Sequence, residues 1–359
     1  MKREKCRGRK IRFYSIITHS LKISEKLSNR PVSGLLLVCV PALIYGCSPS
    51  GFHCPGSENM VKLQIHHTSK AQKESSVFNS IDVFVFNDDI LQRLDSYTRL
   101  EQTVDGLCDV SSRNGPKIMG IIANSSHDIY EWSDINSFMA LCGIKSDLED
   151  EKRDHPVMSG IIRTTTGEDQ EVNLKPLCSK VILRSIRSDF KGKPYEGKEI
   201  KDISVYLINV NARCSLMNDG VEMPERIINC GRLSEYDLSL FKEPELIRQK
   251  IPLPVGNHAV SPDISLICYP NTGSEDTSGS PFTRLVIEGE LDGEIWYWPI
   301  NINREDGNDG VRRNCTYIYD ITITGKGSTD PDIVADPGML NIKFNAKEWL
   351  EKDEYGVYF

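Results

Sequence analysis

One stretch of the sequence predicts its local structure directly: RLVIEGELDGEIWYWPI, residues 284–300. It consists of two β-rich runs, Arg284–Glu290 and Ile295–Ile300, with Asp292-Gly293 between them. A type I′ turn needs a positive φ at both of its central residues, and Asp-Gly is one of the pairs that tolerate this. The stretch therefore predicts a β-hairpin.

Short β-rich runs separated by turn residues extend from the hairpin in both directions. Several alternate apolar and polar residues, which is the period of a half-buried strand, whereas Lys117–Ala123 is apolar enough for a strand buried on both faces. The predicted strands besides the hairpin are Val61–His66, Ile81–Phe86, Ile90–Leu100, Lys117–Ala123, Val157–Thr166, Glu171–Leu174, Val181–Ile186, Ile203–Val210, Ser265–Tyr269, Thr316–Thr324 and Leu340–Phe344. Many short strands of this kind predict an all-β fold of sandwich architecture.

Short helices are predicted only in the connections. Asp134–Cys142 has Ser133 or Asp134 as its candidate N-cap and Gly143 directly behind its end. Two further helical turns are predicted at Ser234–Leu240 and Pro244–Gln249.

The N-terminal part predicts an export signal. The apolar run LLLVCVPALIYGC, residues 35–47, is too short to span a bilayer, which needs about 20 apolar residues, and fits a secretory signal. Ten basic and two acidic residues precede Cys47, which gives the positive flank that stays on the cytoplasmic side. A small residue, Gly46, directly before a cysteine resembles a bacterial lipoprotein signal, so we expect residues 1–46 to be removed and Cys47 to be lipidated. The alternative is an internal buried helix that ends in cysteine.

Charge and length set further limits. The 359 residues have a formal net charge of −8, and removal of the leader with its +8 leaves −16. Such a chain is a poor partner for nucleic acid, whose phosphates need clustered Lys and Arg. We expect two domains of ordinary size, residues 47–176 and 177–359, with the boundary near Pro176, which interrupts the β pattern between Lys175 and Ser179.

The sequence offers no constellation for a metal, a cofactor or catalysis. The eight cysteines after Cys47 have no CxxC pair, so most are expected to be small buried residues, with a disulfide or two left open. Asp306–Gly310 is similar to a calcium loop but lacks the required ligands, and is expected to be a solvated turn. There is no G-x-S-x-G, H-E-x-x-H or P-loop motif, so we expect no enzyme.

Two tryptophans leave an alternative open. Trp296 and Trp298 are two residues apart in a predicted strand and project to one face. They are expected to pack in the core, and the alternative is a platform on which a carbohydrate stacks.

With the strands placed, the chain resembles the fimbrillins of Bacteroidetes, the lipoprotein-derived subunits of type V pili. The resemblance runs through the exported chain: the signal at Cys47, VKLQIHHTSK from Val61, SIDVFVFNDD from Ser80, KIMGIIANSS from Lys117, VNLKPLCSKVILRSI from Val172, VRRNCTYIYDITITGKGSTDP from Val311 and LNIKFNAKEW from Leu340. It implies two transthyretin-like β-sandwich domains and secretion to the outer membrane as a lipoprotein. It also implies that a protease removes an N-terminal strand and that a C-terminal strand of a neighbouring subunit fills the groove.

Val61–His67 is the strand that such processing would remove, because the polar segment Thr68–Ser76 behind it is open to a protease. Members of the family are typically cut after an arginine, yet this chain has none between Cys47 and Arg93. The candidate processing sites are therefore Lys70 and Lys73. The alternative is an unprocessed subunit that keeps its lipid and anchors the pilus.

The last segment is the candidate donor strand. Leu340, Ile342 and Phe344 alternate with polar residues and form one apolar face. The preceding STDPDIVADPG, rich in Pro, Asp and Gly, predicts an extended, detachable connector. A strand left over after Thr316–Thr324 is either exported to a neighbour or lies at the edge of its own sheet.

The sequence thus predicts a subunit of cell-surface fimbriae with a role in adhesion, made as an outer-membrane lipoprotein precursor. Its expected partners are other pilus subunits and the outer membrane, with no cofactor and no nucleic acid, and the sequence does not identify a receptor. The alternative from another class is a surface lipoprotein that binds glycans through Trp296 and Trp298.

Overall fold

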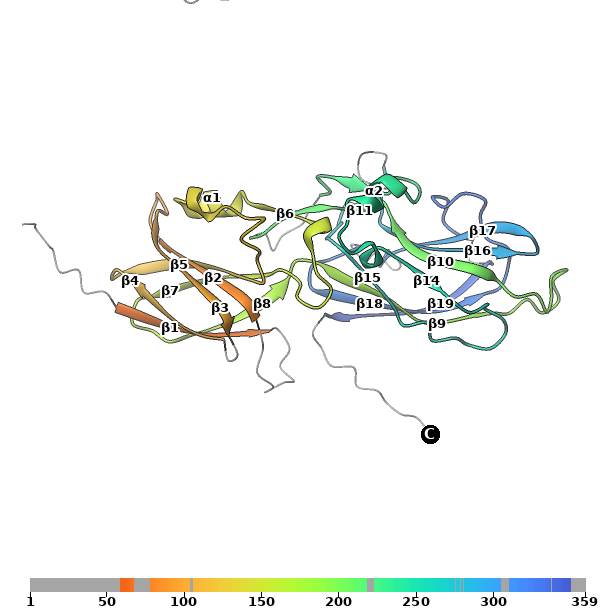
Figure 1. Cartoon of the computed structure of the whole chain (residues 1–359), viewed down its shortest axis with the longest axis horizontal. Helices are drawn as coiled ribbons and strands as arrows, with labels where there is room; N and C mark the ends of the chain where they lie inside the picture. The colour runs from red at the N-terminus through yellow and green to blue at the C-terminus, as the bar shows by residue number, and fades with distance from the viewer. Residues whose placement is uncertain are drawn as a thin grey trace, which may run out of the picture. The chain divides into compact units, whose positions relative to one another are not determined.

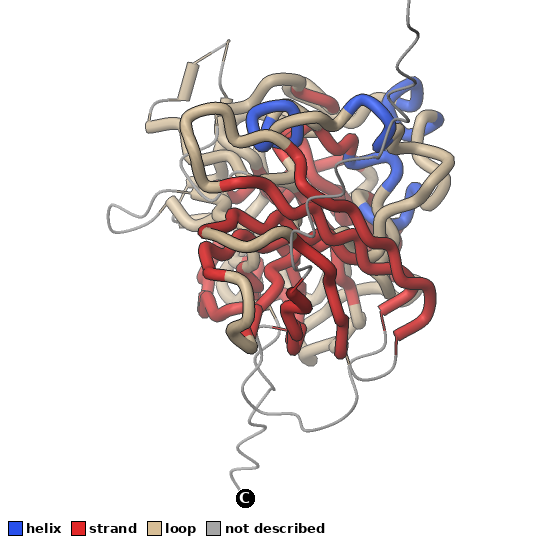
Figure 2. The backbone as a smooth tube through the Cα atoms, turned by 90° about the vertical axis from the view of Figure 1, so that its left-hand side faces the viewer, coloured by secondary structure: helices blue, strands red, loops and turns tan. Residues whose placement is uncertain are grey.

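The fold is all-β, as predicted, and its elements are labelled in a computed structural model (Figure 1). The structure describes residues 59–349 apart from 68–77, 104–105, 218–222, 275, 278, 280, 305–309 and 337. Strands dominate these residues, and the few short helices lie together along one side of them (Figure 2).

The first half of the described chain builds one seven-stranded sheet in the order β3-β2-β5-β7-β8-β1-β4. Its strands are β1 (Asn59–His67), β2 (Phe78–Asn87), β3 (Leu94–Thr103), β4 (Leu107–Ser112), β5 (Pro116–Ala123), β7 (Met158–Thr165) and β8 (Gln170–Pro176). β8 pairs with β1 through Gln170–Leu174 and with β7 through Lys175 and Pro176, so the sheet turns at β8. Apolar side chains of β1, β4 and β8 thereby face those of β2, β5 and β7 across a common core.

The central position predicted for Lys117–Ala123 is confirmed. β5 pairs with β2 on one side and β7 on the other, and both of its faces are buried. Met119 and Ile121 enter the core shared with β1, whereas Ile118 and Ile122 are covered from the opposite side by residues such as Leu141.

The helix predicted at Asp134–Cys142 is split. A 3₁₀ turn, η1 (Trp132–Asp134), ends at Ile135, whose backbone is extended and whose side chain is buried in the core. The α-helix proper is α1 (Phe138–Cys142), and its N-cap is Ser137, whose Oγ accepts a hydrogen bond from the Ala140 N–H at 3.3 Å. Ser133 and Asp134 are therefore not the N-cap, because burial of Ile135 breaks the helical path between them and α1.

The other two helical predictions hold in part. α2 (Glu235–Ser239) is capped by Ser234, and η3 (Pro244–Leu246) begins at its proline. The end of the segment predicted as Pro244–Gln249 instead enters a strand, β14 (Arg248–Ile251), which pairs with β10 (Lys201–Ile208). Pairing along a sheet edge outweighs the helical tendency of those last residues.

The second half of the chain forms two four-stranded sheets, β14-β10-β16-β17 and β15-β9-β18-β19. The further strands are β9 (Ser179–Ser188), β15 (Ile264–Cys268), β16 (Arg284–Leu291), β17 (Glu294–Asn301), β18 (Cys315–Ile323) and β19 (Leu340–Glu348). Both sheets contribute to one buried cluster, with Val205 and Leu285 from the first and Leu183 and Ile321 from the second, so they form a sandwich. The predicted hairpin is present, with φ values of 58° at Asp292 and 85° at Gly293.

Strand pairing and hydrogen bonds join the two halves, in addition to the covalent chain. β6 (Lys145–Asp147) pairs with β12 (Arg213–Ser215), and a second small pair, β11 (Val210–Asn211) with β13 (Ile227–Ile228), lies within the later half. Arg313 donates hydrogen bonds to the carbonyl oxygens of Lys175 at 2.8 Å and Pro176 at 3.0 Å. The change of sheet between β8 and β9 coincides with the division predicted near Pro176. Residues 55–359 nevertheless form one compact unit, so a domain boundary at this position stays a prediction.

A buried carboxyl group also lies at this junction. The two Glu151 carboxyl oxygens accept hydrogen bonds from the Tyr269 hydroxyl at 2.9 Å and from the Val157 N–H at 3.0 Å. Burial, the largest effect, raises the pKa of Glu151 to about 7, although both hydrogen bonds act in the opposite direction. The junction is therefore sensitive to the protonation of one side chain.

Candidate functional site

The first strand lies in the interior of its sheet. β1 pairs antiparallel with β4 and parallel with β8, so both of its edges are occupied. Val61, Leu63 and Ile65 are 0–1% exposed and form its inner face, whereas Lys62 between them is exposed. This confirms the alternation predicted from the sequence and shows that β1 is the middle strand of the β8-β1-β4 layer.

The surroundings of β1 define a slot. Cys108 and Val110 on β4, with Val172 and Leu174 on β8, belong to the same buried cluster as the inner face of β1. If β1 were absent, these apolar side chains and the backbone edges of β4 and β8 would both lose their partners. An open slot with two unpaired strand edges is a template for an incoming strand.

A close backbone contact joins Gly106 to β1 beside the start of β4. The Ile65 N–H donates to the Gly106 carbonyl oxygen at 2.9 Å. Gly106 has a φ of +62°, and a Cβ at this position would lie 2.2 Å from the Ile65 carbonyl oxygen. Only glycine permits this approach, so the chain entering β4 is fitted to β1.

The last strand is an edge strand. β19 pairs antiparallel with β18 from Leu340 to Glu348, and no strand of the described residues pairs with its other edge. Leu340 is 8% exposed, while Ile342 and Phe344 are half-buried. The Phe344 ring centroid lies 5.1 Å from that of Tyr319 and 6.1 Å from that of Tyr317. Of the two alternatives left by the sequence, the isolated chain adopts the edge strand of its own sheet.

The connector before β19 is docked, which corrects the prediction of a detachable segment. Tyr297 and Ser328 exchange backbone hydrogen bonds of 2.9 and 2.7 Å, so the connector lies along the free edge of β17. Asp332 accepts a hydrogen bond from Asn209 at 2.8 Å and forms an ion pair with the buried Arg284. Composition alone did not reveal this attachment, because the partners of the connector are distant in sequence.

The tryptophans of the hairpin face the core, as predicted. Trp298 is 0% exposed and its Nε1–H donates to the Gly325 carbonyl oxygen at 3.0 Å. Trp296 is half-buried against the same cluster, with the Lys326 ammonium 4.8 Å from its ring centroid. The alternative of a carbohydrate platform made of both rings is wrong, because Trp298 is fully buried and cannot contact a sugar.

The remaining predicted site residues cannot be placed. The signal peptide, the lipidation site Cys47 and the processing sites Lys70 and Lys73 lie outside the described residues. Among the lipidation, processing and donor residues, the structure describes the donor face of Leu340, Ile342 and Phe344. Sequence reasoning missed β4, although Cys108, Val110 and Ser112 alternate with exposed residues there and could have revealed it.

The described residues offer little for catalysis. No group of three or more His, Cys, Asp or Glu side chains among them is arranged to hold a metal ion. Burial raises the pKa of the Cys268 thiol to about 12 and that of Cys108 to about 11, the direction opposite to that of a reactive thiolate. Within the same part of the chain, no helix is long and apolar enough to cross a membrane.

The structure thus defines a class: an all-β protein of β-sandwich architecture, with an interior first strand and an edge last strand. No family model and no curated protein matches the chain by sequence.

Solved structures match its fold. A protein assigned to cell adhesion from Bacteroides eggerthii superposes with a TM-score of 0.65 at 15% identity, covering 82% of this chain and 97% of that one. One from Parabacteroides distasonis gives 0.61 at 17% identity with the same coverage. A fimbrilin from Porphyromonas gingivalis gives 0.57 at 12% identity and covers 81% of this chain and 97% of its own. The resemblance to fimbrillins drawn from the sequence is therefore confirmed at the level of the fold.

Proposed function

We propose that this protein is a structural subunit of a cell-surface fimbria of the fimbrillin type, with a role in adhesion and no enzymatic activity. The observation that supports it most is the place of β1. A first strand in the middle of its layer, followed by the polar segment Thr68–Ser76, can be removed by a single cut to open an apolar slot. The fold similarity to a fimbrilin and to cell adhesion proteins points the same way.

The proposed donor is the segment from Met339 onward. Among the described strands, β19 has one neighbour, and its apolar residues repeat at the same period of two as Val61, Leu63 and Ile65. Since the connector up to Ala335 is bonded to β17, the release point lies after it, near the turn in which the Met339 N–H donates to the Asp336 carbonyl oxygen at 2.8 Å.

The precursor is proposed to reach the outer membrane as a lipoprotein through Cys47 and to enter the extracellular fimbrium after processing at Lys70 or Lys73. A cut at the first arginine, Arg93, would fall between β2 and β3 and free both β1 and β2. Loss of β2 would remove the neighbour of β5 and destroy the core. The missing arginine leaves one variant of this function as the alternative, an unprocessed anchor subunit that keeps its lipid.

Complementation between two variants tests the assembly mechanism. A donor variant, Leu340→Asp with Ile342→Asp and Phe344→Asp, keeps an open slot after processing but has no apolar face to export. An acceptor variant, Lys70→Gln with Lys73→Gln, is changed in the processing sites that open the slot. It retains β1, so its own slot stays filled and it can contribute only β19 to a partner. Each alone is expected to stay monomeric, and a mixture is expected to give SDS-resistant dimers without longer ladders.

Two results would contradict the proposal. Long ladders from the donor variant alone would exclude β19 as the donor, and a mixture that stays monomeric while both variants are folded would exclude strand exchange.

Mass analysis of the surface protein separates subunit from anchor, since the anchor retains residue 47 with its fatty acyl groups. Cys47→Ala is expected to abolish fatty-acid labelling, and unchanged labelling would remove the lipoprotein step.

A further inference from the structure

A hollow of about 660 Å³ lies on the outer face of the sheet β14-β10-β16-β17, away from β1 and β19. Its lining includes residues 230–233, Glu235 and the connector residues Thr329–Asp332. We name it the outer-face hollow. Its floor is formed by Tyr206, Glu288 and Tyr297, which three adjacent strands place side by side.

The floor combines one accessible ring with hydrogen-bonding groups. Tyr297 is half-buried and lies directly opposite Glu288 in the register of β16 and β17. The hydroxyl of the buried Tyr206 donates a hydrogen bond of 2.9 Å to the Glu288 carboxylate and holds this carboxylate in place. Burial, together with the nearby charges of Glu288 and Asp330, raises the pKa of Tyr297, so its hydroxyl stays a donor.

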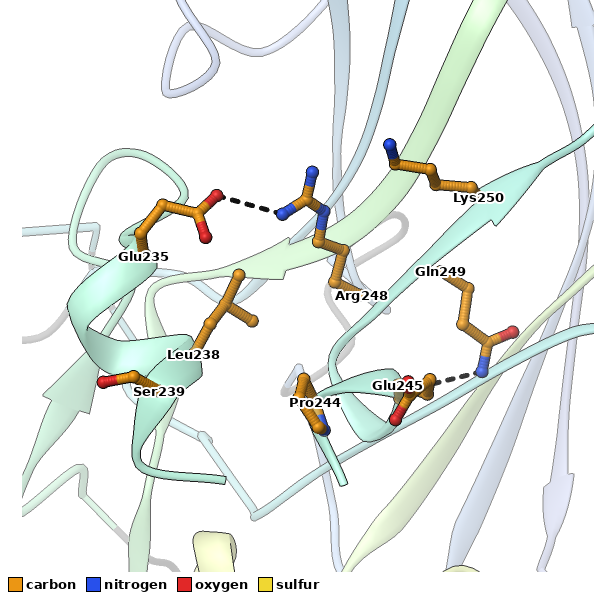
Figure 3. A pocket seen from close by; sticks show the side chains of 8 residues that line it. All are labelled: Glu235, Leu238, Ser239, Pro244, Glu245, Arg248, Gln249 and Lys250. Atoms are coloured by element: carbon orange, nitrogen blue, oxygen red, sulfur yellow. Dashed lines mark hydrogen bonds and ion pairs between the residues drawn. The ribbon is translucent and has the colours of Figure 1, made fainter. Parts of the chain in front are cut away.

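Two guanidinium groups supply donors at the rim. Arg248 donates to Ser204 at 3.3 Å and forms a 3.0 Å ion pair with Glu235. Arg232 is exposed and has no partner among the described residues, so all of its donors are available. Arg248 and Glu235 also line a second hollow of about 470 Å³ beside α2, where the two side chains point toward one another (Figure 3).

We propose that the outer-face hollow binds a neutral saccharide. A sugar ring presents a face of C–H groups that stacks on an aromatic ring, and hydroxyl groups that both donate and accept hydrogen bonds. Tyr297 matches the first requirement, and the presence of Glu288, Asp330, Arg232 and Arg248 in one lining matches the second. An anionic ligand fits poorly, because carboxylates on both the floor and the connector would repel it.

The test measures binding of glucose, galactose, mannose, fucose, N-acetylglucosamine and the anionic N-acetylneuraminic acid to the full chain by saturation-transfer NMR and calorimetry. We expect at least one neutral sugar to bind. Tyr297→Ser and Arg232→Gln are each expected to weaken it by about tenfold or more, as for an aromatic or arginine anchor. Ile295→Ser is the matched control: this side chain is 59% exposed on the same strand and does not line the hollow, so affinity should not change.

Tyr297→Phe separates the ring from the hydroxyl, and thermal unfolding of every variant verifies that the fold persists. The proposal is overturned if none of the neutral sugars binds. It is equally overturned if folded Tyr297→Ser and Arg232→Gln bind as the parent does, or if only the anionic sugar binds. Polymerisation should be unaffected by these variants, and its loss would identify the hollow as a contact between subunits instead.

Discussion

The first and last strands share a sequence pattern and differ in their structural setting. Both β1 and β19 alternate three apolar residues with polar ones. β1 has strand neighbours on both sides and a fully buried inner face. Within the part of the chain that the structure describes, β19 has one strand neighbour and an apolar face that is largely half-buried. The same local pattern thus produces a strand on which a core depends and a strand whose release leaves the rest of its sheet paired. That asymmetry is what an exchange of strands between subunits would require.

The largest expected effect concerns β1. Leu63→Ala should lower the free energy of unfolding by about 2–5 kcal/mol in the unprocessed chain, because it leaves a cavity beside a side chain that is 0% exposed. Lys62→Ala, on the exposed face of the same strand, should change it by less than about 0.5 kcal/mol. Chemical denaturation measures both, and a cost below that of Lys62→Ala would show that β1 does not support the core.

The second prediction concerns the pH dependence of the free energy of unfolding, which tests whether the sandwiches that contain the two strands unfold together. The pKa of Glu151 is raised from its ordinary 4.5 to about 7, so the folded chain binds the proton more tightly than the unfolded chain. The free energy of unfolding should therefore fall as pH rises from about 4.5 to 7, by at most about 3 kcal/mol, and stay level above that.

Glu151→Gln removes this titration and is expected to flatten that part of the curve. Its carbonyl oxygen can still accept from the Val157 N–H, and its amide group can donate to the Tyr269 hydroxyl. Hydrogen exchange at the amides of β1 and β19 is the second measurement. Equal pH dependence at both strands would indicate one cooperative unit. A pH response confined to one strand would separate the two halves, and an unchanged curve in Glu151→Gln would refute the role of this carboxyl.

The smallest expected effect concerns β19. Ile342→Ala should cost only about 1–2 kcal/mol, because its side chain is half-buried and less apolar area returns to water than for a core residue. Lys343→Ala is the neighbouring exposed control. A cost for Ile342→Ala that equals that of Leu63→Ala would place β19 among the core strands and remove the contrast.

Much of the fold could be predicted where the signal is local. The Asp292-Gly293 turn, the central strand ending at Ala123 and the helical turn at Ser234–Leu240 each depend on residues within a few positions of one another. The N-cap of α1 could not be predicted in this way, since Ile135 leaves the helical path in order to fill the core. The prediction of a detachable connector failed for a similar reason. Asp332 of the connector is held by Arg284 on β16 and by Asn209 between β10 and β11, which are both distant in sequence.

By itself, the sequence determined the all-β class, most strands, and which face of β1 and of β19 is apolar, because a period of two is set by the geometry of an extended backbone. Only the tertiary structure decided that β1 lies between β4 and β8 while β19 lies at an edge, and that Tyr206, Glu288 and Tyr297 share one hollow. Strand order joins residues that are far apart in the chain. It therefore depends on how whole faces are buried against one another, which no local pattern encodes.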